Sequence, residues 1–268
     1  IACFSNAYQW FELIGRLTGP SQPLDLLGFL IHRTLRNFHD KVAPMCGRFT
    51  QTASPEMIAK EFGVAVSPLF TPRYNIAPSQ PVAAIRIEPG TANRQLVLLR
   101  WGLIPSWAQD PKIGHQCINA KAETVAEKPS FRAAFKSRRC LVIATGFYEW
   151  QVQGGTKQPM WIGLKNSRPF AFASLWEQWQ PPEGAAIESC TILTTEPNEL
   201  LRPIHNRMPV ILSPMSYDRW LDPTFQQAES LKALLRPYSS EELQAYAVST
   251  LVNNPRHEAP DCLEPLPT

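Results

Sequence analysis

From residue 46 onward, the chain is divided into short apolar runs, each closed by proline, glycine or a polar turn. The sequence holds 26 prolines, and proline removes a backbone donor and fixes one dihedral angle, so long helices are disfavoured. The runs have the length of strands and are rich in β-branched and aromatic residues. In chain order they read QPVAAIRI, RQLVLLRWG, RCLVIATGFYEW, PMWIGL, PFAFASLWEQW, CTILTT and AYAVSTLV. This pattern predicts a domain built from many short strands.

Helix signals are fewer. Ser54 and Gly63 frame the stretch SPEMIAKEFG as an N-cap and a stop, with proline at the first helical position. Ser213 repeats the Ser-Pro opening, and Ser239 begins a capping box in SSEELQAY. Because strands do not alternate regularly with helices, a parallel α/β architecture is disfavoured. We therefore expect one α+β domain over residues 46–268, with a mostly antiparallel, barrel-like sheet and peripheral helices.

Residues 1–45 differ from the rest. The sequence begins with isoleucine, and its first methionine is Met45. The stretch LLGFLIHRTLRNF has apolar residues at close to helical spacing, which predicts an amphipathic helix over 27–38. It lacks the basic start, the clean apolar core and the cleavage site of a targeting peptide. We expect a segment outside the domain; a misassigned start, a true extension and a targeting segment all remain open.

Composition narrows the function classes. The net charge of +3 is small and does not by itself argue for a nucleic-acid partner. No apolar run approaches the roughly 20 residues that span a bilayer, so we expect no membrane association. The six cysteines show no C-x-x-C spacing and no accompanying H-x-x-x-H pair, so we expect no metal site. Without a secretory signal, disulfides are also not expected, which indicates a reducing cytoplasm.

Four polar residues stand in stretches that are otherwise apolar or turn-like. They are Cys46 in MCGRF, Asn119 in CINAKAET, Glu149 in GFYEW and His205 in IHNRMPV. Each also has a plain structural interpretation. Cys46 would be a small buried hydrophobic residue, and Asn119 would cap a helix over AKAETVAE. Glu149 would lie at the rim of a sheet, and His205 would be a histidine of the core. Glu149 is the least ordinary of them, because burial between two aromatic residues would raise its pKa and suit it to proton transfer.

Eight stretches together carry a likeness to a known family. In order they are MCGRFT, PRYNIAPSQ, RWGLIPSW, INAKAET, RRCLVIATGFYEW, FAFASLWE, TILTT and IHNRMPVIL. They resemble the SOS response-associated peptidase (SRAP) family, whose members sense abasic sites in DNA. The likeness runs from Met45 to about Leu212 and is looser toward the C-terminus. It implies a single SRAP-type domain and leaves residues 1–44 outside it.

The resemblance implies a specific role for Cys46. Family members begin Met-Cys-Gly-Arg and lose the methionine, which leaves cysteine as the first residue. A free N-terminal cysteine carries an amine with a pKa of about 7.7–8.0 and a thiol with a pKa of about 8.5. An aldehyde condenses with that amine to an imine, and the thiol then closes a thiazolidine ring. A ring-opened abasic deoxyribose supplies the aldehyde, so the resemblance implies covalent capture of abasic sites in single-stranded DNA.

The other three residues also receive roles by resemblance. Asn119 hydrogen-bonds and positions the opened sugar. Glu149 assists ring opening and proton transfer. His205 acts as acid or base in imine formation, in strand-cleaving β-elimination, or in reversal of the crosslink. No cofactor is implied, and we expect a monomer that joins the nucleoid when it acts on DNA.

Since the net charge is small, contacts with DNA must be local. Basic residues in or beside the motifs could hold phosphates: Arg48, Arg73, Lys121, Arg138, Arg139 and Arg207. Trp101 and Trp107 could stack on unpaired bases, although core packing is an equal alternative for Trp101. Asn75 and Pro78 lie on a turn that could meet the DNA backbone.

Two further functions remain open. The first is a thiol peptidase, acting on other chains or on itself, that uses Cys46, Glu149 and His205. The second is a binder of single-stranded DNA without catalysis. A denaturation-resistant complex with an abasic oligonucleotide distinguishes both from covalent capture.

Overall fold

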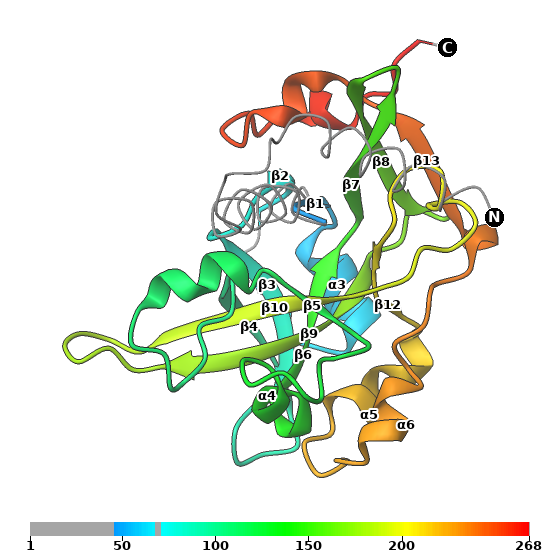
Figure 1. Ribbon diagram of the computed structural model, residues 1–268. Coiled ribbons are helices and arrows are strands. Elements are labelled where there is room, and N and C mark those ends of the chain that lie inside the picture. The colour runs from blue at the N-terminus through cyan, green and yellow to red at the C-terminus, as the bar shows by residue number, and fades with distance from the viewer. Residues whose placement is uncertain (1–45, 68–70, 268) are drawn as a thin grey trace, which may run out of the picture. The chain divides into compact units, whose positions relative to one another are not determined.

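The structure is a computed structural model that describes residues 46–67 and 71–267 (Figure 1). The helix expected over 27–38 lies outside these residues. The strands are β1 Arg48–Gln51, β2 Arg73–Ile76, β3 Pro81–Ile87, β4 Arg94–Trp101, β5 Asn119–Lys121, β6 Arg139–Ala144, β7 Gly146–Gln153, β8 Thr156–Leu164, β9 Phe170–Trp179, β10 Ile187–Thr195, β11 Met208–Pro209, β12 Ile211–Leu212 and β13 Leu243–Ala247. The α-helices are α3 Pro55–Phe62, α4 Arg132–Ser137, α5 Tyr217–Leu221 and α6 Ala228–Lys232. The 3-10 helices are η1 Pro111–Gln116, η2 Pro214–Ser216, η3 Ser240–Glu242, η4 Thr250–Asn253 and η5 Pro260–Leu263.

The strands form two sheets. One has the order β13-β8-β7-β1-β2, and the other has the order β11-β10-β4-β3-β6-β9-β12. In the second sheet β10 also pairs with β9, so β10, β4, β3, β6 and β9 form a closed ring. All pairings are antiparallel except those of β10 with β4 and with β5. The expected α+β fold with a mostly antiparallel, barrel-like sheet is confirmed.

Thr145 marks the point where the chain passes from one sheet to the other. It lies between β6, in the barrel, and β7, in the five-stranded sheet. Its hydroxyl contacts the hydroxyls of Thr50 and Thr52 at 3.1 and 3.0 Å, and its backbone N–H donates to the Thr50 carbonyl at 2.8 Å. These contacts fasten β1 to the start of β7, the strand that carries Glu149.

The barrel strands are buried on both faces. Along β6, Leu141 and Ile143 contact the cluster that includes α3, α4 and α5, whereas Val142 and Ala144 contact the cluster that includes β1, β7 and β8. This two-residue alternation is the ordinary property of a strand. In Figure 1, α5 and α6 accordingly lie on the far side of the barrel strands from β7, β8 and β13. The site described below lies on the side of the five-stranded sheet.

The helix predictions had mixed outcomes. Ser54 caps α3 by accepting from the Met57 N–H at 3.3 Å, and Gly63 ends it with a φ of 64°, as expected. Ser239 does not cap a helix: one 3-10 turn follows it and leads into β13. Asn119 lies in a strand, and turns rather than a helix follow it.

No helix in the described part of the chain combines the length and the apolar character that crossing a bilayer requires.

Candidate functional site

Cys46 lies two residues before the start of β1, on the side of the barrel covered by the five-stranded sheet. Its side chain is 1% exposed and packs in a cluster with Phe49 and Phe147. Its backbone N–H donates to Oε1 of Glu149 at 2.8 Å. Its φ is 40°, in the left-handed region that side chains other than glycine rarely adopt. Burial, with the nearby Glu149 adding to it, raises the pKa of the Cys46 thiol well above its usual value.

Glu149 reaches Cys46 because of strand pairing. Antiparallel β7 aligns Tyr148 with Arg48 on β1. Successive residues of a strand point to opposite faces, so Tyr148 and Trp150 pack together in a separate cluster. Glu149 points the other way and is 2% exposed. The expectation that these two rings bury the carboxyl was therefore wrong, although the carboxyl is buried.

Asn119 joins the site from β5. Its strand pairs in parallel with β10, which places Asn119 opposite Ile192. The side-chain amide donates to the backbone carbonyl of Cys46 at 3.4 Å. The backbone carbonyl and the backbone N–H of Cys46 are thus each held by a polar side chain from a distant part of the sequence.

His205 comes from the loop between β10 and β11. Asn198 shapes this loop by accepting from the Leu201 N–H at 3.0 Å, and Gln151 donates to the Pro203 carbonyl at 3.1 Å. Nδ1 of His205 lies 4.0 Å from Oε2 of Glu149. The same nitrogen lies 3.3 Å from both the backbone N and the backbone O of Arg207, so either neutral tautomer finds a partner.

The charge states of the two titratable groups follow from burial. Burial raises the pKa of Glu149 to about 8, opposed in part by the hydrogen bond from Cys46. Burial lowers the pKa of His205; the hydrogen bond with Arg207 opposes this and the charge of Lys157 adds to it. Near neutral pH, a protonated carboxyl therefore faces a neutral imidazole. This is a proton donor beside a proton acceptor, as general acid–base chemistry requires.

Two residues predicted to contact DNA are parts of the core instead. Arg139 is 1% exposed, and all five of its N–H groups donate to backbone carbonyls. Trp101 is fully buried, packs edge-on against Phe49 and donates its indole N–H to the Ile118 carbonyl at 2.9 Å. Neither side chain can meet a phosphate or a base at the surface, so the prediction for Arg139 was wrong. For Trp101, the alternative of core packing is the one that holds.

Two further predicted contacts hold the C-terminal part of the domain. Asn75 is fully buried and donates to the carbonyls of Val252, Asn254 and His257. Arg48 donates to the Asn75 side chain at 2.8 Å and to the Val252 carbonyl at 2.6 Å. Pro78 lies half-buried in the turn after β2. Arg48 and Asn75 therefore hold the C-terminal part of the domain against β1 and β2, and this role is independent of any contact with DNA.

The remaining predicted contacts lie at the surface. Trp107 is 59% exposed and lines a hollow of about 320 Å³ together with Asp110 and Lys112. Lys121 is exposed, and Arg73, Arg138 and Arg207 are half-buried. Each of the three arginines is paired with a carboxylate at 2.8, 2.6 and 2.6 Å, the partners being Glu258, Glu177 and Glu123. A bound phosphate would compete with those carboxylates.

Sequence reasoning missed two features. Lys157, in β8, acts on His205 through its charge, and nothing in its local sequence indicates this. A group of three potential metal ligands, His257, Asp261 and Cys262, lies near the C-terminus. The search for paired cysteines or paired histidines could not find it, because each ligand is of a different type.

Comparisons with known proteins agree with the sequence motifs. A family model described as SOS response associated peptidase (SRAP) matches residues 45–255. The abasic site processing protein YoqW of Bacillus subtilis is 48% identical over 224 residues, which cover 82% of this chain and 99% of that protein. The abasic site processing protein HMCES of Xenopus tropicalis is 31% identical over 262 residues, covering 82% of this chain and 78% of that protein.

Solved structures share the fold. A crystal structure of a protein from Bacteroides thetaiotaomicron has a TM-score of 0.75 and 26% identity, and it covers 82% of this chain and 100% of that one. A second, from Bordetella bronchiseptica, has a TM-score of 0.65 and 27% identity, with 76% and 100% covered.

Proposed function

Because the chain belongs to the SOS response-associated peptidase family, we propose that it processes abasic sites in single-stranded DNA by capturing them on Cys46. Its relatives named abasic site processing proteins support the substrate class. The observation that carries the mechanism is the 2.8 Å contact between the Cys46 nitrogen and Glu149, with His205 on the other carboxyl oxygen. The reacting nitrogen and a proton donor would already be in contact before substrate arrives.

The proposal requires Cys46 to be the first residue of the working protein. While residue 45 is attached, the Cys46 nitrogen is an amide and cannot form an imine. We propose that residues 1–45 are absent from the mature protein, and that residues 46–268 act alone as the domain. In cells it would act in the cytoplasm, at the nucleoid.

The reaction balances without a cofactor. The amine adds to the aldehyde carbon of the opened sugar and gives a carbinolamine. Glu149 and the freed amine share a proton, which the carboxyl holds while the amine is neutral and nucleophilic. Glu149 then protonates the hydroxyl, which leaves as water, and the resulting iminium returns a proton to the carboxylate as the imine forms. The Cys46 sulfur then adds to the imine carbon while its proton passes to nitrogen, which closes the thiazolidine. Asn119, already bonded to the Cys46 carbonyl, would position the sugar.

His205 takes the complementary role. A neutral imidazole beside Glu149 can accept the proton that the carboxyl receives during turnover, or it can return one when the ring opens. Strand cleavage by β-elimination needs a base to remove a proton from the sugar, and we propose His205 as that base. We also propose that any lyase activity and any self-processing activity use these same residues.

The test is covalent capture. Purified protein, with its N-terminus established by intact mass, is mixed with a labelled single strand containing one abasic site. We expect a band that survives denaturation. A strand whose abasic sugar has been reduced, and so lacks the aldehyde, should give none. A thiol peptidase or a simple DNA binder gives no band with either strand.

Two variants assign the chemistry to Cys46. Cys46→Ala should abolish stable capture and retain most non-covalent binding, because affinity arises from many phosphate and stacking contacts. Cys46→Ser keeps the amine but cannot close the sulfur ring, so its band should require a reductant that traps the imine. Equal stable capture by either variant without reductant would rule out the thiol as the ring-closing group.

A further inference from the structure

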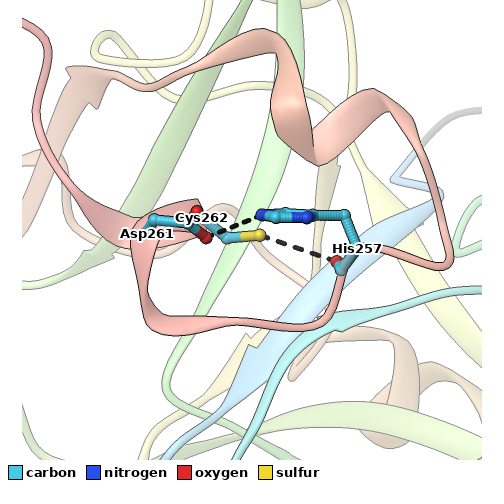
Figure 2. Close-up of side chains that lie close together, drawn as sticks. All are labelled: His257, Asp261 and Cys262. Carbon is cyan, nitrogen blue, oxygen red and sulfur yellow. Dashed lines mark hydrogen bonds and ion pairs between the residues drawn. The ribbon is translucent and has the colours of Figure 1, made fainter.

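Three side chains with different ligand atoms meet at one end of the C-terminal segment, residues 248–266. They come from His257, Asp261 and Cys262, and their ligand atoms lie within 4.8 Å of one another (Figure 2). Nε2 of His257 lies 2.7 Å from Oδ1 of Asp261. Figure 2 shows the imidazole and the thiol side by side, with Asp261 facing the ring nitrogen.

From this arrangement we propose a zinc-binding site formed by His257 Nε2, Asp261 Oδ1 and Cys262 Sγ, with a water molecule as the fourth ligand. Imidazole nitrogen, carboxylate oxygen and thiolate sulfur are the three protein donors that Zn²⁺ takes. A thiolate among them argues against Mg²⁺ or Ca²⁺, which prefer oxygen ligands. The site is separate from the one built on Cys46 and does not depend on the function proposed above.

The backbone that carries the ligands is held independently of any metal. The His257 carbonyl accepts from the buried Asn75 side chain at 2.8 Å, and the His257 N–H donates to the Asn254 carbonyl at 3.0 Å. The Cys262 carbonyl accepts from the Tyr148 hydroxyl at 3.2 Å. Both ends of the ligand set are thus fixed, so binding would order little more than three side chains.

Glu258 adds to this support. Its carboxylate accepts from the backbone N–H groups of Tyr74 and Asn75, and it is paired with Arg73 at 2.8 Å. The residue directly after His257 is therefore fastened to β2. Its engaged carboxylate is not counted among the ligands.

The three ligand side chains differ in burial, and this difference suits a metal site. Cys262 is fully buried against Tyr148 and Val252, whereas the side chains of His257 and Asp261 are 29% and 39% exposed. The sulfur is therefore shielded, while the other two ligands border solvent that can deliver the ion and supply water. Without metal, the hydrogen bond between His257 and Asp261 fills the position. A bound ion would replace it, and the thiol proton would leave to solvent.

We expect a bound ion to stabilise the folded conformation of the C-terminal segment. Arg48 donates to the carbonyl of Val252, and Asn75 donates to the carbonyl of His257. The zinc ligands therefore lie in the same segment that these two side chains hold. Arg48 is two residues from Cys46, so the zinc site would secure the part of the fold that borders the start of β1. An ion that binds only the folded state raises stability by mass action.

The test uses Co²⁺ as a spectroscopic probe in the full chain carrying Cys3→Ser and Cys46→Ala, which removes two competing thiols. We expect one equivalent of Co²⁺ to produce a thiolate-to-metal charge-transfer band, and Zn²⁺ to displace it. Adding Cys262→Ala should abolish the band. His257→Gln and Asp261→Asn should each weaken binding by more than about tenfold, since even groups that only support a ligand contribute that factor. Cys190→Ala, which removes an equally buried thiol elsewhere, should change nothing.

Thermal unfolding supplies a second readout. In the protein that carries Cys3→Ser and Cys46→Ala, saturating Zn²⁺ should raise the midpoint of thermal unfolding by roughly 5 °C or more. Adding His257→Gln should remove this rise. Should Cys262→Ala fail to fold, His257→Gln and Asp261→Asn carry the test, because both alter partly exposed side chains. Absence of a charge-transfer band, or the same band in all three ligand variants, would overturn the proposal.

Discussion

At the scale of single residues, the protonated state of Glu149 is the property on which the proposed chemistry depends most. Its carboxyl is 2% exposed, and burial raises its pKa to about 8. The hydrogen bond from Cys46 occupies Oε1, which leaves Oε2, the oxygen nearer His205, to carry the proton. An amide in place of the carboxyl would preserve the first contact and remove the transferable proton.

We therefore expect Glu149→Gln to slow crosslink formation by about 10²–10⁴-fold, the usual contribution of a general acid. The Gln oxygen can still accept from the Cys46 nitrogen, so binding of DNA should be retained. The measurement is a time course of the denaturation-resistant band under single-turnover conditions, with non-covalent affinity measured on an intact strand.

His205→Ala is the matched comparison. Its loss should slow formation less and should chiefly slow release of the crosslink into excess competitor strand. If both variants formed and released the crosslink at the unsubstituted rate, neither group would be catalytic. Glu149 and His205 would then be buried polar groups whose role is structural.

The raised pKa of Glu149 also predicts how stability changes with pH. A group whose pKa is higher in the folded state favours folding below its unfolded pKa, and this contribution is lost as the pH rises through the folded value. Here that window runs from about pH 4.5 to about pH 8. The lowered pKa of His205 acts in the opposite direction, but only below 6.5. Between pH 6.5 and 8, Glu149 is therefore the member of this pair that changes the unfolding free energy with pH.

We expect Glu149→Gln to flatten the fall in unfolding free energy between pH 6.5 and 8, and to be the more stable protein at pH 8.5. The difference should be on the order of a few kcal/mol at most. Urea unfolding at several pH values measures it. An identical slope in both proteins would show that the carboxyl does not hold a raised pKa.

Arg139 provides a prediction about stability alone. Its five donors satisfy carbonyls of α4, of α5 and of the turn after α5. Arg139→Met would leave those groups buried without partners, each at a cost of about 1–3 kcal/mol unless it relaxes toward water. We expect a loss of at least about 3 kcal/mol in urea unfolding. Arg132→Met, at an exposed position of α4, should stay within about 0.5 kcal/mol. A stable Arg139→Met that lost only DNA binding would restore the phosphate role.

At the scale of elements, the C-terminal segment is held chiefly by side chains from β1 and β2. Asn75→Ala removes the donor to three carbonyls of that segment. We expect faster hydrogen exchange and faster proteolysis over residues 249–264, together with a loss of about 2–3 kcal/mol of unfolding free energy. Asn93→Ala, at an exposed position, is the control. Unchanged exchange over 249–264 would mean that apolar packing alone holds the segment.

The elements also show what the sequence could predict. The strands were predictable, because apolar runs closed by proline or glycine have few other uses. So was α3, where Ser54 and Gly63 satisfy the helix ends locally. The Ser239 capping box was misleading, since pairing of β13 with β8 outweighs a weak local signal. The alternative interpretation of Asn119 as a helix cap was wrong as well, because its strand pairs in parallel with β10, some seventy residues away in the sequence.

The motifs selected four residues that the structure brings together, but they could not predict how these residues contact one another. Motifs selected Cys46, Asn119, Glu149 and His205, yet their contacts join residues 73 and 103 positions apart. No local rule gives such distances. Period-two alternation could have shown that Tyr148 and Trp150 face away from Glu149. Burial of Arg139 and Trp101 depended on tertiary packing, which the basic and aromatic residue types do not reveal.

At the scale of the whole molecule, the structure reduces the set of basic residues expected to contact DNA. Of the six basic residues first considered, Arg139 is buried and Arg48 donates to carbonyls of the C-terminal segment. The four others are Arg73, Lys121, Arg138 and Arg207. Single strands lose about 0.7 in log affinity per log salt for each phosphate neutralised, so we expect a slope of about −3 or shallower.

The measurement is non-covalent binding of an intact single strand, an intact duplex and a single-strand/duplex junction at several salt concentrations. We expect the single strand and the junction to bind better than the duplex. Lys121→Ala should reduce the slope by about 0.7, and Lys165→Ala, at an exposed position outside the motifs, should leave it unchanged. Affinity that ignores salt, or a preference for duplex, would exclude this set of contacts.

The backbone of Cys46 links maturation to folding. Its φ of 40° is a rotation that exists only while a residue precedes it. A side-chain-bearing residue held in that region costs on the order of 1–2 kcal/mol. Cutting the bond before Cys46 abolishes the rotation and this cost together. Considered by itself, the backbone strain therefore favours the cut state of the folded domain by that amount, and it favours folding of the trimmed chain over folding of its precursor by the same amount.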